Sequence, residues 1–455
     1  MEPLGDHTFN RDLKKNKEYP LIKKGSGNYL YREDGSKVFD AACGAAVACL
    51  GYGKKRVLWS MAKQMYKITY LASSFWNSDV VKDLSKELIQ GTGDKLEGVY
   101  LTGSGSEAME AAIKLSRQFF FEEDHKTPRV NYIARERSYH GNTLGALSIS
   151  GFETRKAAQE PNLMRNVHFI SSCYPYRQQG ANESDQDFVA RKVQELEDKF
   201  LELGPESVIG FIAEPIVGAA LGCVPSPPGY LKGMRDVCHR HGALFILDEV
   251  MCGSGRTGTL HAWQAEDVVP DIQTMAKGLG AGYQPVAAML VSEKVVKRMM
   301  EGSGEFAHGQ TYQFMPLQAA AALEVQRIIR KDKLMENVSK QGTYLERRLK
   351  DLLSNHPNVG DIRGRGLFWG IEFVKDRNTS EPFDVALQVA VRIKDLGISQ
   401  FDITVYSSAG CVDGIRGDFI MIAPAFTITK KDVDQIVSKV NNLVNHFFRN
   451  CIQNL

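Results

Sequence analysis

Two residues of this sequence have the types and settings that covalent chemistry on an amine requires. Lys277 follows the hydrophobic segment ending at Met275-Ala276 and precedes glycines, so the chain can carry its amine inward, where it can condense with an aldehyde. Asp248 closes the apolar run 243–247, and an acid at the end of a buried strand needs a partner such as a cationic pyridinium nitrogen. Pyridoxal phosphate (PLP) contains both groups, so the pair indicates PLP as the cofactor.

A phosphate-binding motif occurs earlier in the chain. Residues 98–102 are predicted as a short strand, 103–106 as a Gly-Ser-Gly-Ser loop and 107–118 as a helix. Such a loop at a helix N-terminus offers free backbone N–H groups, the helix dipole and serine hydroxyls, so a phosphate fits there. The same loop could hold a dinucleotide, but it lacks the third glycine of that fingerprint. A flexible turn is the remaining alternative.

Further candidate side chains follow other predicted strands. Tyr139 and His140 come after the strand 130–134, and Glu214 follows the strand 208–213. The alternation of apolar strands with helices predicts an α/β domain with a mainly parallel sheet. Ligands bind beyond the carboxyl ends of the strands in such sheets, so we expect these side chains at one edge. There Tyr139 could stack on a flat ring.

Composition limits the class of protein. A chain of 455 residues is too long for one ordinary core and implies about two domains. Its net charge of +2 argues against nucleic acid or an anionic membrane as partner. The sequence shows no signal peptide and no apolar stretch of membrane-spanning length, which predicts a cytoplasmic protein. The eight cysteines form no Cys-x-x-Cys pair, so reduced thiols and no metal site are expected.

Several elements outside the cofactor motifs are also predicted. Pro316 opens a long helix over 317–329 that leads to a second unit, in which residues 384–396 form a helix. Thr429 is expected to cap the last helix, with an acid three residues later completing a capping box. The aromatic segment 73–77 is predicted to pack in the core, with a pocket wall as the alternative.

Together these motifs resemble one family, the class III PLP-dependent aminotransferases, whose relatives include ω-amino-acid and amine transaminases. The resemblance covers roughly residues 25–445, and the motifs occur in the family's order and spacing. They are Ser104-Gly105-Ser106-Glu107-Ala108, Tyr139-His140-Gly141, Glu214-Pro215-Ile216, Leu247-Asp248-Glu249-Val250, Gly255-Arg256-Thr257-Gly258, Ala276-Lys277-Gly278 and Thr311-Tyr312.

The resemblance implies the PLP-dependent transferase fold type I, with a large domain built on a mainly parallel sheet and a small α+β domain. Residues 58–325 would form the large PLP-binding domain. Residues 1–57 would contribute to the small domain, which 326–455 would complete. The resemblance also implies a homodimer whose active sites lie at the subunit interface.

The resemblance assigns roles to the matched residues. Lys277 would hold the cofactor aldehyde and Asp248 the ring nitrogen, and both would be catalytic together with Tyr139. Val250 and Tyr139 would pack on opposite faces of the ring. Glu214 would be a gating carboxylate near the ring, and Thr311 would reach the phosphate from the other subunit. The complete expected cofactor-binding set is Ser104, Gly105, Ser106, Tyr139, His140, Glu214, Asp248, Val250, Lys277 and Thr311.

The implied reaction moves an amino group from an amine or ω-amino acid to a keto acid (pyruvate or 2-oxoglutarate), or to an aldehyde or ketone, with ping-pong kinetics. Many family members grip the substrate carboxylate with an arginine where this chain has Gly414. Arg416, two residues away, either reaches the site by a different loop path or lies on the surface. Phe75, Trp76 and Arg416 are the candidate substrate residues.

Other functions remain open at this stage. Aminomutases, racemases and decarboxylases of this fold use the same constellation, because a few side chains decide the fate of the Cα proton or carboxylate. A nicotinamide-dependent dehydrogenase would leave Lys277 and Asp248 without a role. A non-catalytic binding protein would have no need for the lysine, the aspartate, the phosphate loop and the tyrosine together.

Overall fold

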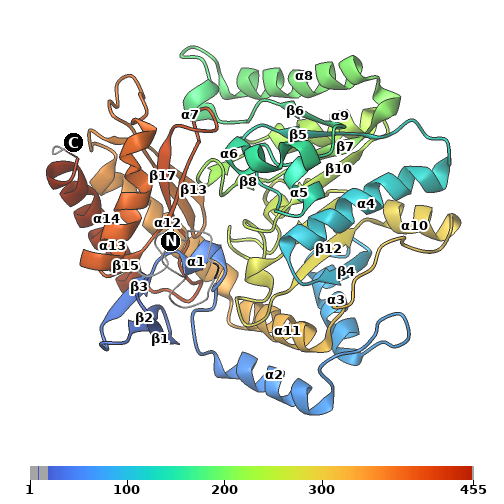
Figure 1. The fold of residues 1–455 in the computed structure, drawn as a ribbon, viewed down its shortest axis with the longest axis horizontal. Helices are drawn as coiled ribbons and strands as arrows, with labels where there is room; N and C mark the ends of the chain where they lie inside the picture. Colours follow the sequence, from blue (N-terminus) through green and yellow to red (C-terminus); the bar gives the residue numbers. More distant parts are fainter. Residues whose placement is uncertain (1–8, 10–18, 453–455) are drawn as a thin grey trace.

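A seven-stranded sheet organises the larger, right-hand part of the fold in Figure 1. The computed structural model describes residue 9 and residues 19–452, so the start of the predicted 1–57 segment lies outside the described residues. The strands run in the order β4-β12-β11-β10-β7-β5-β6. Their bounds are β4 Gly98–Thr102, β5 Asn131–Arg135, β6 Val167–Ile170, β7 Val208–Ala213, β10 Leu244–Asp248, β11 Ile272–Met275 and β12 Ala287–Val291.

Parallel pairing dominates this sheet, as the sequence predicts. The pairs β10–β11, β10–β7, β5–β7 and β5–β6 are parallel, whereas β12 is antiparallel to both β11 and β4. The connection from β11 to β12 is too short for a full crossover helix, which explains the reversal. As a result β12 presents its amino end at the edge where its neighbours present their carboxyl ends.

Helices cover both faces of the sheet. In β10, Leu244 and Ile246 pack with α4, α5 and α10, whereas Phe245 and Leu247 pack with α8 and α9 on the opposite face. A strand buried on both faces must be apolar along its whole length, which explains the uninterrupted apolar run before Asp248. The helix bounds are α4 Gly105–Glu123, α5 Leu144–Ser148, α8 Asp185–Leu203, α9 Tyr230–Arg240 and α10 Glu293–Glu301.

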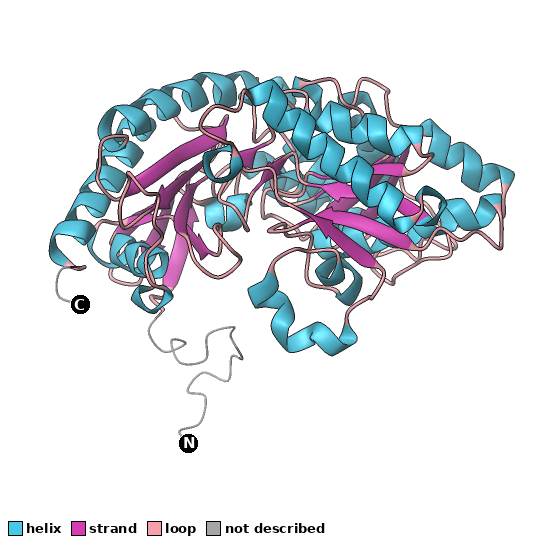
Figure 2. Cartoon of the chain, turned by 90° about the horizontal axis from the view of Figure 1, so that it is seen from above, coloured by secondary structure: helices cyan, strands magenta, loops and turns pink. Residues whose placement is uncertain are grey.

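A second group of strands lies beside the first, and helices flank both groups (Figure 2). The antiparallel sheet β13-β14-β17-β16 shares a core with α12 and α14. Strand β3 pairs in parallel with β15, which ties the N-terminal hairpin to the C-terminal part. The bounds are β1 Ile22–Ser26, β2 Tyr29–Arg32, β3 Lys37–Asp40, β13 Val359–Arg365, β14 Phe368–Phe373, β15 Ile403–Thr404, β16 Tyr406–Ala409, β17 Asp418–Ile422, α12 Leu334–Leu353, α13 Val389–Gln400 and α14 Lys430–Asn450.

Shorter elements and connecting helices complete the chain. Among the described residues, no helix is both long and apolar enough to cross a membrane. The remaining bounds are α1 Cys43–Ala46, α2 Lys55–Lys67, α3 Asp79–Gly91, α6 Glu153–Lys156, α7 Pro175–Gln178, α11 Pro316–Lys331, β8 Ile216–Val217, β9 Val224–Pro225 and the 3₁₀ turns η2 Ala157–Asn162, η3 Pro205–Ser207, η4 Ala262–Ala265, η5 Lys277–Leu279 and η6 Val385–Leu387.

The structure confirms one local prediction and overturns two others. The capping box at Thr429 is present, with both reciprocal hydrogen bonds. The helix expected over 384–396 begins only at Val389, because Gln388 has a left-handed φ of 47° that separates it from η6. The prediction that the segment 73–77 packs in the core is wrong, because Phe75 and Trp76 are 77% and 67% exposed.

Candidate active site

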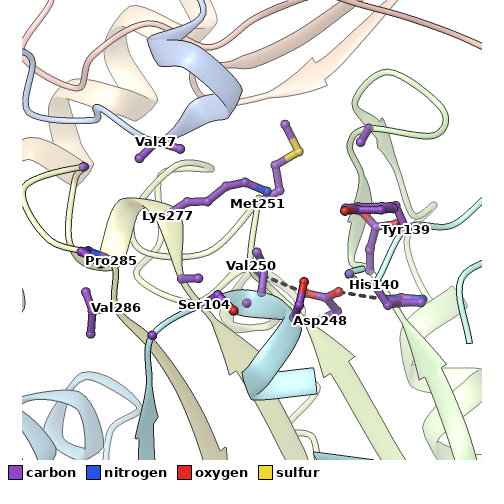
Figure 3. Close-up of a pocket in the computed structure, with 18 of the residues that line it drawn as sticks. Val47, Ser104, Tyr139, His140, Asp248, Val250, Met251, Lys277, Pro285 and Val286 are labelled. Carbon is purple, nitrogen blue, oxygen red and sulfur yellow. Dashed lines mark hydrogen bonds and ion pairs between the residues drawn. The ribbon is translucent and has the colours of Figure 1, made fainter. Parts of the chain in front are cut away.

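A cavity of about 540 Å³ lies at the edge where β4, β5, β7, β10 and β11 end (Figure 3). The parallel strands deliver their following residues to this edge, as the sequence predicts. Nine of the predicted cofactor-binding residues line it, namely Ser104, Gly105, Ser106, Tyr139, His140, Glu214, Asp248, Val250 and Lys277.

Lys277 enters the cavity from the turn that follows β11. Its backbone is left-handed, with φ of 44°, and its carbonyl accepts hydrogen bonds from the N–H groups of Gly280 at 3.2 Å and Ala281 at 2.9 Å. Burial lowers the pKa of the Lys277 amine, although the negative charge of Asp248 opposes the shift. A lowered pKa increases the neutral fraction of the amine, which is the form that acts as nucleophile and base.

Asp248 is buried at the end of β10, and both of its carboxylate oxygens have a hydrogen-bond partner. Its Oδ2 lies 2.8 Å from His140 Nδ1, and its Oδ1 accepts a hydrogen bond from the Val250 N–H at 3.0 Å (Figure 3). His140 is itself buried, and its Nε2 has no hydrogen-bond partner within the described chain. A carboxylate has about four acceptor positions, so Asp248 keeps acceptor capacity toward the cavity that it lines.

Glu214 links Tyr139 to the turn after β7. Its Oε1 accepts a hydrogen bond from the Tyr139 N–H at 3.1 Å, and its Oε2 accepts one from the Gly218 N–H at 3.0 Å. Burial raises the pKa of this carboxyl, and the negative charge of Asp248 adds to the increase. The Tyr139 ring stands edge-on to Phe152 with centroids 6.3 Å apart, so its position is fixed by packing as well as by Glu214.

The predicted phosphate loop has the structure of a capped helix N-terminus. Ser104 is the N-cap of α4, and its hydroxyl accepts a hydrogen bond from the Glu107 N–H at 3.2 Å. Gly105 and Ser106 are the first two helical residues, so their N–H groups have no intrahelical acceptor. They border the cavity, where an anion would also meet the positive end of the helix dipole.

The close approach of the phosphate loop to Val250 requires glycine at position 105. A Cβ added to Gly105 would lie 2.9 Å from Val250 Cγ1 and 3.0 Å from its Cγ2. Val250 itself lines the cavity, so a larger residue at position 105 would push it toward the ring. The amine of Lys277, the acceptor Asp248 and the N-terminus of α4 thus offer PLP a partner for its aldehyde, its ring nitrogen and its phosphate.

Four predicted residues do not line this cavity in the single chain. Phe75 and Trp76 border a separate surface hollow, together with Gln313 and Phe314. Thr311 is exposed. Arg416 is 55% exposed and forms an ion pair with Asp413, with Nε and Oδ2 2.6 Å apart, so it occupies the surface rather than the cavity.

The structure also brings in residues that sequence reasoning missed. Val47 reaches the cavity from the tight turn after β3, and Met251 follows Val250 (Figure 3). Gln284, Pro285 and Val286 also line the cavity, from the segment directly before the reversed strand β12. The small residues before Val47 predict a turn, but they do not predict which part of the molecule that turn faces. The short connection between β11 and β12, by contrast, could have predicted that Gln284, Pro285 and Val286 lie at the cavity, because it reverses the chain at this edge of the sheet.

Comparison with known proteins identifies the family. The sequence profile described as aminotransferase class-III matches residues 13–444. An aminotransferase of Gibberella zeae is 47% identical over 435 residues, which cover 94% of this chain and 85% of that protein. The taurine–pyruvate aminotransferase of Bilophila wadsworthia is 33% identical over 94% of this chain and 92% of its own length. The solved structure of a PLP-bound amine transaminase from an uncultivated Pseudomonas species is 28% identical, with a TM-score of 0.89 and 98% of each chain covered. The chain therefore belongs to the class III aminotransferases, which depend on PLP.

Proposed function

We propose that this aminotransferase takes the amino group of an amine or ω-amino acid and passes it to a keto acid, pyruvate or 2-oxoglutarate, or to an aldehyde or ketone, in two half-reactions. The observation that carries the proposal is the convergence of Lys277, Asp248 and the N-terminus of α4 on one cavity. The resemblance to a taurine–pyruvate aminotransferase supports an amine donor and a keto-acid acceptor.

Each side chain of the cavity would have a separate role in this reaction. When bound, PLP supplies an aldehyde that bonds to amines and a ring that withdraws electrons. The charge of Asp248, oriented by His140, favours a protonated ring nitrogen. Lys277 Nζ, whose pKa is lowered by burial, would remove the proton from the substrate Cα and deliver it to the carbon of the former cofactor aldehyde. Val250 and Tyr139 would contact the two ring faces, and Glu214 would hold the Tyr139 backbone.

An absorbance titration of the purified protein tests the proposal. With PLP bound, we expect a band at about 410–430 nm. Single amines, added without any acceptor, should abolish this band, and pyruvate or 2-oxoglutarate should restore it, because the two half-reactions are separate. A protein that keeps its band with every amine would instead be a racemase, mutase or decarboxylase. A colourless protein that takes up no PLP would contradict the role of Lys277.

We further propose a homodimer in which the partner completes the active site. An apolar surface on and after α2 supports this proposal: Trp59 is 66% and Tyr66 94% exposed, and both lie on one side of the helix. Phe75, Trp76 and Thr311 are exposed as well, as residues that act in a partner's site would be.

We also propose a cytoplasmic location. The eight cysteines are all free, which supports a reducing compartment such as the cytoplasm.

Replacing both Trp59 and Tyr66 by glutamate should convert the dimer to monomers, because two charges would be buried in an apolar interface. Sedimentation velocity would show the change, and activity should fall in parallel, since each site would lose its partner's residues. Leu201→Glu, at a position 60% exposed on α8, is the control and should leave the assembly intact. If the double variant stays dimeric, the subunit interface does not include Trp59 and Tyr66.

A further inference from the structure

Arg155 is a cation beside the active site whose charge is not neutralised. It belongs to α6 and is partly buried, and its side chain has no ion pair or hydrogen bond within residues 19–452. Its guanidinium carbon lies 4.8 Å from the centroid of the Tyr139 ring and 5.0 Å from that of Phe152. Arg155 does not itself line the cavity, but Tyr139 does, so the uncommitted N–H donors of Arg155 lie directly behind that part of the cavity wall.

The positive charge of Arg155 acts electrostatically on the amine of Lys277. Burial lowers the pKa of Lys277, and repulsion by Arg155 contributes in the same direction, whereas Asp248 and Glu214 raise it. A guanidinium that acts electrostatically on Lys277 also acts on an acid group of a substrate bound there. The oxygens of Glu214 accept hydrogen bonds from the N–H groups of Tyr139 and Gly218, and neither oxygen pairs with Arg155 within the described residues.

The loop that carries Gly414 packs against the same short helix. A Cβ added to Gly414 would lie 3.6 Å from Cγ and 3.7 Å from Cβ of Glu153, which is two residues before Arg155. Arg416, the nearest arginine of the loop, instead forms its ion pair with Asp413 at the surface. The chain therefore lacks an arginine at Gly414 and has an unpaired one on the helix that contacts this position.

We propose that Arg155 binds the acid group that ω-amino-acid donors and keto-acid acceptors share. The proposal rests on the aminotransferase function proposed above and names the substrate class that the site prefers. A guanidinium presents parallel N–H donors that match a carboxylate or sulfonate, and the contact with the Tyr139 ring keeps the guanidinium beside the cavity. The donor and the acceptor occupy the same site in turn, but their acid groups lie at different distances from the reacting carbon, so an ω-amino-acid donor is the direct test.

A matched pair of donors tests this assignment in the first half-reaction. β-Alanine and propylamine have the same chain length, but only β-alanine carries an acid. Arg155→Met should raise the apparent Kd for β-alanine roughly 10- to 100-fold, the loss expected for a charged hydrogen-bonded pair, and change that for propylamine less than about threefold. Arg155→Lys should fall between the two, because it keeps the charge without the parallel donors. Arg416→Met should leave both donors unchanged.

A binding measurement gives a readout that does not depend on turnover. Calorimetry of propanoate, an acid without an amine, should show binding to the PLP-loaded wild type and to Arg416→Met, but not to Arg155→Met. Equal losses for β-alanine and propylamine would overturn the proposal, since Arg155 would then only position Tyr139. Loss of propanoate binding in Arg416→Met alone would move the acid site to the loop. If propanoate bound through Arg155 while no amine abolished the absorbance band, the aminotransferase proposal would fail and the acid site would stand.

Discussion

Lys277→Ala should lose at least about 10⁴-fold in turnover, because in the proposed reaction the same amine is both the covalent attachment point and the base that moves the Cα proton. The cavity supplies no second amine, since Lys277 is the only lysine among the residues that line it in the described chain. The variant should still bind PLP without a covalent bond, through Asp248 and the N-terminus of α4. Single-turnover absorbance measurements with one amine would give the rate.

A chemical readout separates loss of Lys277 from loss of folding. Borohydride treatment of the PLP-loaded wild type should fix the cofactor on the peptide that contains Lys277, and mass spectrometry should find no such peptide in Lys277→Ala. Lys297→Ala, which changes a lysine 69% exposed on α10, is the control and should behave as wild type. Cofactor fixed on a different lysine, with turnover retained, would show that the reactive amine has been misassigned.

Asp248→Asn should slow the first half-reaction by about 10³-fold, the effect expected when a single preorganised charge is removed from a closed site. Asparagine keeps the shape of the side chain and a hydrogen-bonding group toward His140, so the fold should survive. The neutral amide would no longer favour a protonated ring nitrogen, and the substrate Cα–H would become less acidic. Stopped-flow absorbance with a saturating amine would measure the rate.

A second buried aspartate provides the matched control. Asp271 lies before β11, where its Oδ2 accepts a hydrogen bond from the Phe245 N–H at 2.8 Å and lies 3.1 Å from His239 Nε2. Asp271→Asn should lower the melting temperature without slowing the half-reaction, because this carboxylate does not line the cavity. Equal effects of both substitutions on the rate would mean that Asp248 acts through stability rather than through charge.

The sequence by itself determined the sheet edge and most of the residues that line the cavity there. Apolar runs of strand length, each followed by a polar or glycine residue, are local signals, and parallel pairing brings the carboxyl ends together. For that reason Ser104, Asp248 and Lys277 could be placed at one site although they are far apart in the chain. The capping box at Thr429 is equally local, because its two hydrogen bonds span three residues.

The tertiary structure decided what depends on contacts between distant segments. Arg256, part of a family motif, is buried and donates from Nη1 to the Leu367 carbonyl at 3.1 Å and from Nη2 to the Ala46 carbonyl at 3.4 Å, next to the cavity residue Val47. No local pattern predicts that contact, and none predicts Arg155 over Tyr139.

The exposure of Phe75 and of Arg416 likewise follows from packing. An aromatic or charged residue type has the same local signal whether its neighbours in space are core, solvent or a partner subunit. The residue types and strand periods therefore determined which reactive side chains meet at the cavity. The packing of segments that are distant in the chain determined the remaining walls of the cavity and the position of Arg155 beside Tyr139.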